Sequence, residues 1–202
     1  MEAWIGSVFS LFCHQLPERS PSFGEAAFPL CWRCAGFYIG ILSSYLFLAL
    51  SGGTRRRLPR VPSLIAASAL MTPFLVDGWA NTLGLWDTPG WLRASTGLGY
   101  GVVLPLVLVP LVDRQTLFDP DLKPTVSHPA ALALPLTIAS VMLRALIEPP
   151  SEAVFEGLAI AVFLSFLLFV ANFLLALRVG RAGLASVASR RAQGSPLEVS
   201  HG

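Results

Sequence analysis

The residues best suited to chemistry are three cysteines and one histidine near the start of the chain. Cys13 and His14 are adjacent, and Cys31 and Cys34 follow as a Cys-x-x-Cys pair. No other cysteine occurs in the sequence. A Cys-x-x-Cys turn brings two thiolates to one side, which suits a tetrahedral metal such as zinc. The same spacing also suits a reversible disulfide.

Cys13, His14, Cys31 and Cys34 together could supply four ligands to zinc or another transition metal. His14 is the weakest member of the set, because the side chains of adjacent residues diverge. Two other interpretations stay open. A structural disulfide could join Cys13 to one of the later cysteines. Alternatively, Cys31 and Cys34 could act as a membrane thiol–disulfide oxidoreductase with Cys13 as the partner thiol.

A second candidate site consists of two charged residues, Asp77 and Arg93, at the ends of apolar runs. A carboxylate and a guanidinium at matching depth can form a bidentate ion pair. That pair would close the loop between two membrane spans, or it would line a polar pocket in which Arg93 holds an anionic lipid or solute. If Arg93 holds such an anionic group, the protein is a binding or transport module.

The composition places these residues in a membrane protein. Of the 202 residues, 54% are hydrophobic and 13% are charged, whereas soluble domains carry about 25% charged residues. A surface that faces lipid needs no charge, so we expect an all-α, multi-pass protein of the cell membrane with the lipid bilayer as its partner. The net charge of +2 is too small to suggest nucleic acid.

About five apolar runs are long enough, with their flanks, to cross a bilayer. They cover residues 35–50, 61–76, 95–112, 129–147 and 154–177. The sequence therefore predicts an N-terminal segment (1–34) that carries the Cys/His cluster, a transmembrane helical domain (35–177) and a basic, disordered tail (178–202).

The basic residues predict the orientation of these spans. Ten of the 14 fall in the first loop, the third loop and the tail, which share one side when there are five spans: Arg55, Arg56, Arg57, Arg60, Arg114, Lys123, Arg178, Arg181, Arg190 and Arg191. Positive loops stay in the cytoplasm. We therefore expect the N-terminus and the cysteines outside, and the C-terminus inside.

Two further patterns predict packing. Gly36 and Gly40 in the first span, and Gly97 and Gly101 in the third, have the Gly-x-x-x-Gly spacing that lets helix backbones approach. We expect these two spans to be neighbours. Residues 1–12 form either an interfacial helix or a helix packed on the spans.

Two segments carry a family resemblance. Phe12-Cys-His-Gln-Leu-Pro-Glu-Arg-Ser20 and Leu30-Cys-Trp-Arg-Cys-Ala-Gly-Phe-Tyr-Ile-Gly40 resemble the signature of domain of unknown function 2085, a group of small prokaryotic membrane proteins. Asp77-Gly78 and the stretch from Leu92 to Gly101 resemble later motifs of that family. The resemblance implies a membrane protein in which the outer-face cluster is a unit, and it implies no particular activity.

Overall fold

The computed structural model describes residues 3–51, 57–112 and 121–192 of the chain. Within these ranges, five helices are long and apolar enough to cross a membrane, as predicted. They are α2 (Trp32–Leu50), α3 (Val61–Thr82), α4 (Gly90–Val112), the segment Pro129–Ile147 that contains α6 (Ala133–Ile147), and the stretch Glu152–Arg178 of α7 (Glu152–Ala192). Three of them, α2, α3 and α4, extend beyond the predicted apolar runs at the end where the cysteines lie.

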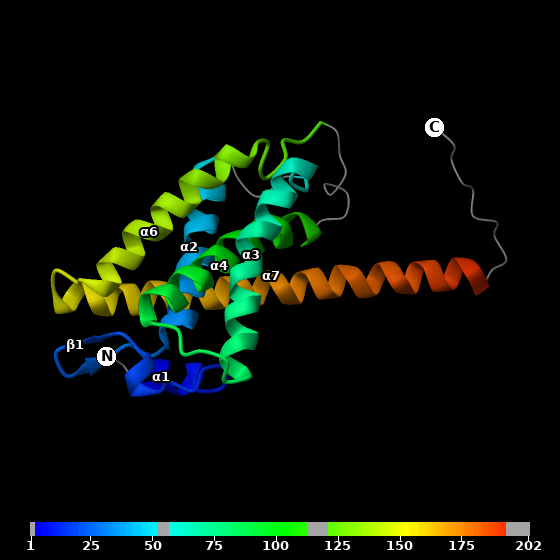
Figure 1. Ribbon diagram of the computed structural model, residues 1–202. Helices are drawn as coiled ribbons and strands as arrows, with labels where there is room; N and C mark the ends of the chain where they lie inside the picture. Colours follow the sequence, from blue (N-terminus) through cyan, green and yellow to red (C-terminus); the bar gives the residue numbers. More distant parts are fainter. Residues whose placement is uncertain (1–2, 52–56, 113–120, 193–202) are drawn as a thin grey trace.

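The N-terminal segment folds into short elements at one end of the bundle. It contains α1 (Ala3–Phe9), the 3₁₀ turn η1 (Pro17–Arg19), and the strands β1 (Ser22–Phe23) and β2 (Ala26–Ala27). The strands pair antiparallel around Gly24, whose φ of +58° favours glycine. The all-α prediction thus holds for the spans and misses this small hairpin. Figure 1 shows α1, the hairpin and the end of α3 gathered at the same end.

The first and third predicted spans, α2 and α4, pack backbone to backbone, as the glycine spacing predicted. A Cβ added to Gly36 would lie 2.0 Å from the carbonyl oxygen of Ala94, and one added to Gly101 would lie 2.0 Å from that of Phe37. No side chain fits such a gap, so glycine is required at these positions. The buried Ser44 adds an interhelical hydrogen bond, because its Oγ donates to the Val102 carbonyl at 2.6 Å.

The outer surfaces of α3 and α7 carry the apolar side chains expected to face lipid. Trp79 of α3 is 69% exposed, and Ile65, Leu164 and Leu168 are also exposed. Soluble proteins rarely leave so many large apolar groups in water. The side chains nearest the axis of the bundle are instead buried among α2, α4, α6 and α7.

The N-terminal helix α1 packs on the bundle, which decides between its two predicted roles. Phe9 is fully buried. Its ring lies 5.7 Å from that of Tyr38 in α2 and 5.6 Å from that of Phe166 in α7, measured between centroids. Burial of this aromatic cluster holds the segment that leads to Cys13 against the spans.

The last helix, α7, continues to Ala192, where we expected a disordered tail from residue 178. The region after Arg178 is rich in Ala and Arg, which have high helix propensity, and it propagates a helix that is already formed. In Figure 1 α7 extends well beyond the other helices. Residues 193–202 lie outside the described part of the chain.

The two loops at the far end of the bundle from the cysteines are joined to each other. The Arg57 amide donates to the Lys123 carbonyl at 3.3 Å, and the Thr125 amide donates to the Arg57 carbonyl at 3.0 Å. The first and third loops, which carry most of the basic residues used for orientation, therefore share one end. Of those residues, Arg55, Arg56 and Arg114 lie outside the described ranges.

Candidate metal centre

The three cysteines converge at the end of the bundle that holds the N-terminal segment. The sulfur atoms of Cys13, Cys31 and Cys34 all lie within 4.8 Å of one another. Cys13 is buried, and the other two are half-buried. The backbone amide of Cys31 also donates a hydrogen bond to the Cys13 sulfur at 3.3 Å. The structure thus brings together residues that are far apart in the sequence, with three sulfur donors facing one point.

Local structure explains how each sulfur is placed. Cys13 ends the turn that follows α1, where its amide donates to the Phe9 carbonyl at 2.9 Å. Cys31 is the N-cap residue of α2, and Cys34 lies in the first turn of that helix. The hairpin of β1 and β2, which lies between Cys13 and Cys31 in the sequence, reverses the chain and returns it to the start of α2. The first backbone N–H groups of a helix favour a nearby anion, and this effect opposes the rise in the pKa of Cys31 that its contact with Cys13 causes.

Gln15 holds the Cys13 loop in place. Its side-chain amide donates to the carbonyl of Gly6 and to that of Pro29, both at 2.8 Å. Its backbone has a φ of 49°, a left-handed conformation that costs a non-glycine residue about 1 kcal/mol. Two hydrogen bonds to otherwise separate segments offset that cost. Gln15 therefore fixes the distance between the two cysteine-bearing segments.

The sulfur atoms influence one another's protonation. Hydrogen bonds from the Cys31 and Cys34 thiols hold the pKa of Cys13 far below its ordinary value, although burial opposes the effect. The same contact with Cys13 raises the pKa of Cys31. Cys13 is therefore the first of these two thiols to become a thiolate, the form that binds a metal.

His14 lies beside the cluster without joining it. Its side chain is exposed, and neither ring nitrogen belongs to the group of mutually close sulfur atoms. It nevertheless lines the same cleft as the cysteines. This placement fits the expectation that the side chains of adjacent residues diverge.

The cleft in front of the cysteines has a volume of about 330 Å³. Besides the three cysteines and His14, its lining includes three arginines, Arg19, Arg33 and Arg93, together with Phe12, Gln15 and Leu16. Neither Asp77 nor Asp87 lines it. The wall is therefore cationic and sulfur-bearing.

Asp77 and Arg93 lie close together, but the structure places a different arginine against Asp77. The buried Asp77 carboxylate pairs with Arg33, the residue between the two later cysteines. It also accepts hydrogen bonds from Thr88 and, at 2.9 Å, from Asn81. The expected direct pair with Arg93 is replaced because Arg33, in the first turn of α2, projects toward the end of α3.

Arg93 joins the same network through one intermediate residue. Its guanidinium donates to the Asn81 side-chain oxygen and to the Thr88 carbonyl, both at 2.7 Å, and it pairs with Asp87. Asn81 thus links Arg93 to Asp77. The buried network fastens the start of α4 to the end of α3, and through Arg33 to the cysteine-bearing turn of α2.

Sequence reasoning missed Gln15 and Arg33 as positioning residues, and missed Asn81, Thr88 and Asp87 as network partners. A signal existed for the first two, because both lie inside the two cysteine segments. No spacing pattern marks the other three, which are brought together only by the tertiary packing of α3 and α4.

Comparison with known proteins agrees with this architecture. Residues 13–107 match the family of predicted membrane proteins DUF2085. An uncharacterised protein of Methanothermobacter thermautotrophicus is 32% identical over 102 residues, which cover 49% of this chain and 86% of the relative. The chain belongs to the DUF2085 family.

A second relative extends the comparison. The uncharacterised protein MJ1492 of Methanocaldococcus jannaschii is 30% identical over 106 residues, which cover 52% of this chain and 66% of the relative. No solved structure matches the chain. The DUF2085 match begins at Cys13 and ends within α4, so it contains the cysteines and the polar network, whereas α6 and α7 lie beyond it.

Proposed function

We propose that this DUF2085 protein binds one divalent transition metal ion, with zinc favoured, through Cys13, Cys31 and Cys34. The observation that supports the proposal is the mutual approach of the three sulfur atoms within 4.8 Å. A tetrahedral zinc ion with Zn–S bonds of about 2.3 Å separates its sulfur ligands by roughly 3.8 Å. Only a small inward movement of the side chains is needed to reach that geometry. Thiolate donors favour zinc over hard cations such as magnesium.

The fourth position of such a site faces the cleft. His14 lines that cleft and is the protein's own candidate for the fourth ligand. If His14 stays exposed, an external ligand takes the position. Three protein ligands with one open position are typical of catalytic zinc sites, whereas four protein ligands are typical of structural ones. The role of His14 therefore separates a reactive site from a structural one.

The proposed site lies on the outer side of the membrane. This placement follows from the basic loops at the opposite end of the bundle and from the positive-inside rule. The N-terminus would then be outside and the C-terminus inside. A metal at this position would be accessible to solutes outside the cell and to the outer leaflet.

A thiol–disulfide oxidoreductase is the second candidate, and one observation favours it. The three sulfur atoms lie within 4.8 Å of one another, and the lowered pKa of Cys13 makes this thiol, rather than Cys31, the first to form the thiolate that attacks a disulfide. The sequence pattern had instead suggested the Cys-x-x-Cys pair for that role, with Cys13 as the partner thiol. Three thiols in mutual reach would allow the Cys13 thiolate to attack a substrate disulfide, and a second cysteine to displace the mixed disulfide, so that the substrate leaves as two thiols and Cys13 is left in a disulfide with that cysteine.

Metal analysis of the full chain, purified in detergent without oxygen, separates the two candidates. We expect about one zinc ion per chain. Cys13→Ser, Cys31→Ser and Cys34→Ser should each reduce the metal content strongly. His14→Ala should reduce it less, and His128→Ala, a change of an exposed histidine at the far end, should have no effect. Protein with no metal and with a quantitative disulfide would contradict the metal proposal and favour the oxidoreductase.

A further inference from the structure

Two hollows of different chemistry meet at Arg33. The first is the cationic cleft in front of the cysteines. The second, of about 350 Å³, is a groove on the lipid-facing side of α3, lined by Arg33 together with Phe74, Leu75, Gly78, Trp79 and Thr82. Arg33 therefore forms part of both walls, with a polar space on one side and an apolar one on the other.

The charges of the cleft are arranged for an anion. Arg19, Arg33 and Arg93 line it, while their carboxylate partners Asp77 and Asp87 do not. Each carboxylate pairs with a guanidinium from outside the cleft, so three arginines line the cleft against the one thiolate expected at Cys13. Arg19 is the least constrained of the three, because its guanidinium lies 3.9 Å from Asp87 and its side chain is 45% exposed. It is free to turn toward a ligand.

Exposed tryptophans mark the membrane boundary near the two hollows. Trp79, Trp86 and Trp91 are all exposed and surround the connection between α3 and α4. Exposed tryptophans gather at the boundary between headgroups and acyl chains. The cleft would then lie at the level of the headgroups, and the groove along α3 would lie at the level of the acyl chains.

We propose that the two hollows together bind one anionic phospholipid, with its phosphate in the arginine-lined cleft and one acyl chain in the groove on α3. Guanidinium groups bind phosphate by charge-assisted hydrogen bonds. Phe74, Leu75 and Trp79 provide the apolar contact for the chain. The binding does not require the metal, although it brings the lipid headgroup next to the cysteines.

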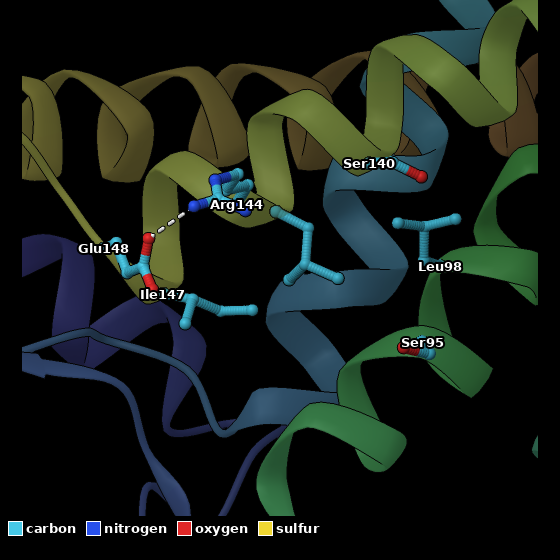
Figure 2. A pocket seen from close by; sticks show the side chains of 7 residues that line it. Ser95, Leu98, Ser140, Arg144, Ile147 and Glu148 are labelled. Atoms are coloured by element: carbon cyan, nitrogen blue, oxygen red, sulfur yellow. Dashed lines mark hydrogen bonds and ion pairs between the residues drawn. The ribbon is translucent and has the colours of Figure 1, made fainter.

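Another groove on the molecule lacks this complementarity and serves as a control. It has a volume of about 390 Å³ and lies between α4 and α6, where Ser95 and Ser140 face it (Figure 2). Its arginine, Arg144, is paired with Glu148 at 2.9 Å, and Glu148 itself lines the groove. The charges of this groove are therefore balanced, and it offers an anion no net attraction.

Native mass spectrometry of the full chain in a neutral detergent tests the proposal. Phosphatidylglycerol and phosphatidylcholine with identical acyl chains are added separately to zinc-loaded and to metal-free protein. We expect one phosphatidylglycerol per chain, retained in both metal states, and about tenfold weaker retention of phosphatidylcholine. A competition with inorganic phosphate distinguishes a lipid from a free anion.

Two variants probe the two hollows separately, each with a matched control. Arg19→Gln should weaken retention of phosphatidylglycerol about fivefold or more, and Arg144→Gln should leave it unchanged. Gly78→Leu places a side chain in open space within the groove and should weaken retention to a similar degree. Gly157→Leu fills open space on α7 and should have no effect. Both glycine replacements favour the helix, so the variants should fold.

Three results would overturn the proposal. Equal retention of the two lipids would mean that the arginines do not select the headgroup. Unchanged retention in Gly78→Leu would mean that no chain occupies the groove on α3. Full displacement of phosphatidylglycerol by inorganic phosphate at equal concentration would identify a site for a free anion. Loss of zinc with unchanged lipid binding would count against the metal site alone, so the two proposals fail independently.

Discussion

Replacing Gly101 by alanine tests whether the close contact between α2 and α4 positions the rest of the protein. The added Cβ would lie 2.0 Å from the carbonyl oxygen of Phe37. Ordinary carbon–oxygen contacts begin near 3.3 Å. The two helices must therefore separate by roughly 1.3 Å at this point, because both contacting atoms belong to rigid helix backbone.

The energetic cost follows from two contributions. Overpacking a buried contact costs about 1–3 kcal/mol. The hydrogen bond from Ser44 to the Val102 carbonyl, one residue away from Gly101, would stretch and lose about 1 kcal/mol. A total of about 2–4 kcal/mol corresponds to a fall in Tm of roughly 4–16 °C for a chain of this size. The assay is thermal unfolding of the full chain in detergent, followed by circular dichroism.

A matched control makes this result specific. Gly157→Ala adds the same methyl group to an apolar helix where nothing lies within 4 Å of the new Cβ. We expect no loss of stability there, since alanine has the higher helix propensity. If Gly101→Ala unfolds at the same temperature as the unmodified protein, the tight contact between α2 and α4 does not exist, and the cleft that Cys34 of α2 and Arg93 of α4 both line loses its basis.

Three other predictions address the site and its orientation. In metal-free protein, iodoacetamide should modify Cys13 at lower pH than Cys31, because the pKa of Cys13 is lowered and that of Cys31 is raised; in Cys31→Ala the Cys13 profile, read by mass spectrometry, should move to higher pH, and an unmoved profile would refute the assigned cause. Arg33→Met leaves the buried Asp77 carboxylate without its charged partner and should cost about 1.5–3 kcal/mol of stability. Arg33→Met combined with Asp77→Leu should be more stable than Arg33→Met alone, and thermal unfolding that ranks them in the opposite order would contradict the buried pair. Alkaline phosphatase fused to the C-terminus should be inactive, and a fusion within the α3–α4 connection should be active. The reverse pattern would mean that the N-terminus lies inside and the C-terminus outside.

The spans could be predicted from the sequence because they depend on a local property. A run of apolar residues long enough to cross a bilayer identifies itself without knowledge of the fold. The Gly-x-x-x-Gly spacing likewise predicted that α2 and α4 are neighbours. The ends of the helices could not be predicted as well, because polar residues such as Asn81 and Arg93 continue the helices only where they find partners on other segments.

The sequence predicted which cysteines belong to the candidate site, but it did not predict the contacts that position them. The types and spacing of Cys13, Cys31 and Cys34 were enough to group them, and the structure brings their sulfur atoms together. The partner of Asp77 was not predictable, since it depends on the direction in which Arg33 leaves the first turn of α2. The two hydrogen bonds that the Gln15 side chain donates were not predictable either, because they join carbonyl groups of two distant segments.

The most direct test of the metal proposal is X-ray absorption spectroscopy at the zinc edge on the purified, zinc-loaded protein. We expect three sulfur ligands at about 2.3 Å and one nitrogen or oxygen ligand at about 2.0–2.1 Å. Cys13→Ser should lower the sulfur count, because the structure places this residue's sulfur in the cluster with those of Cys31 and Cys34. A zinc ion surrounded by nitrogen and oxygen alone, or a sulfur count that Cys13→Ser leaves unchanged, would contradict a metal centre built from these three cysteines.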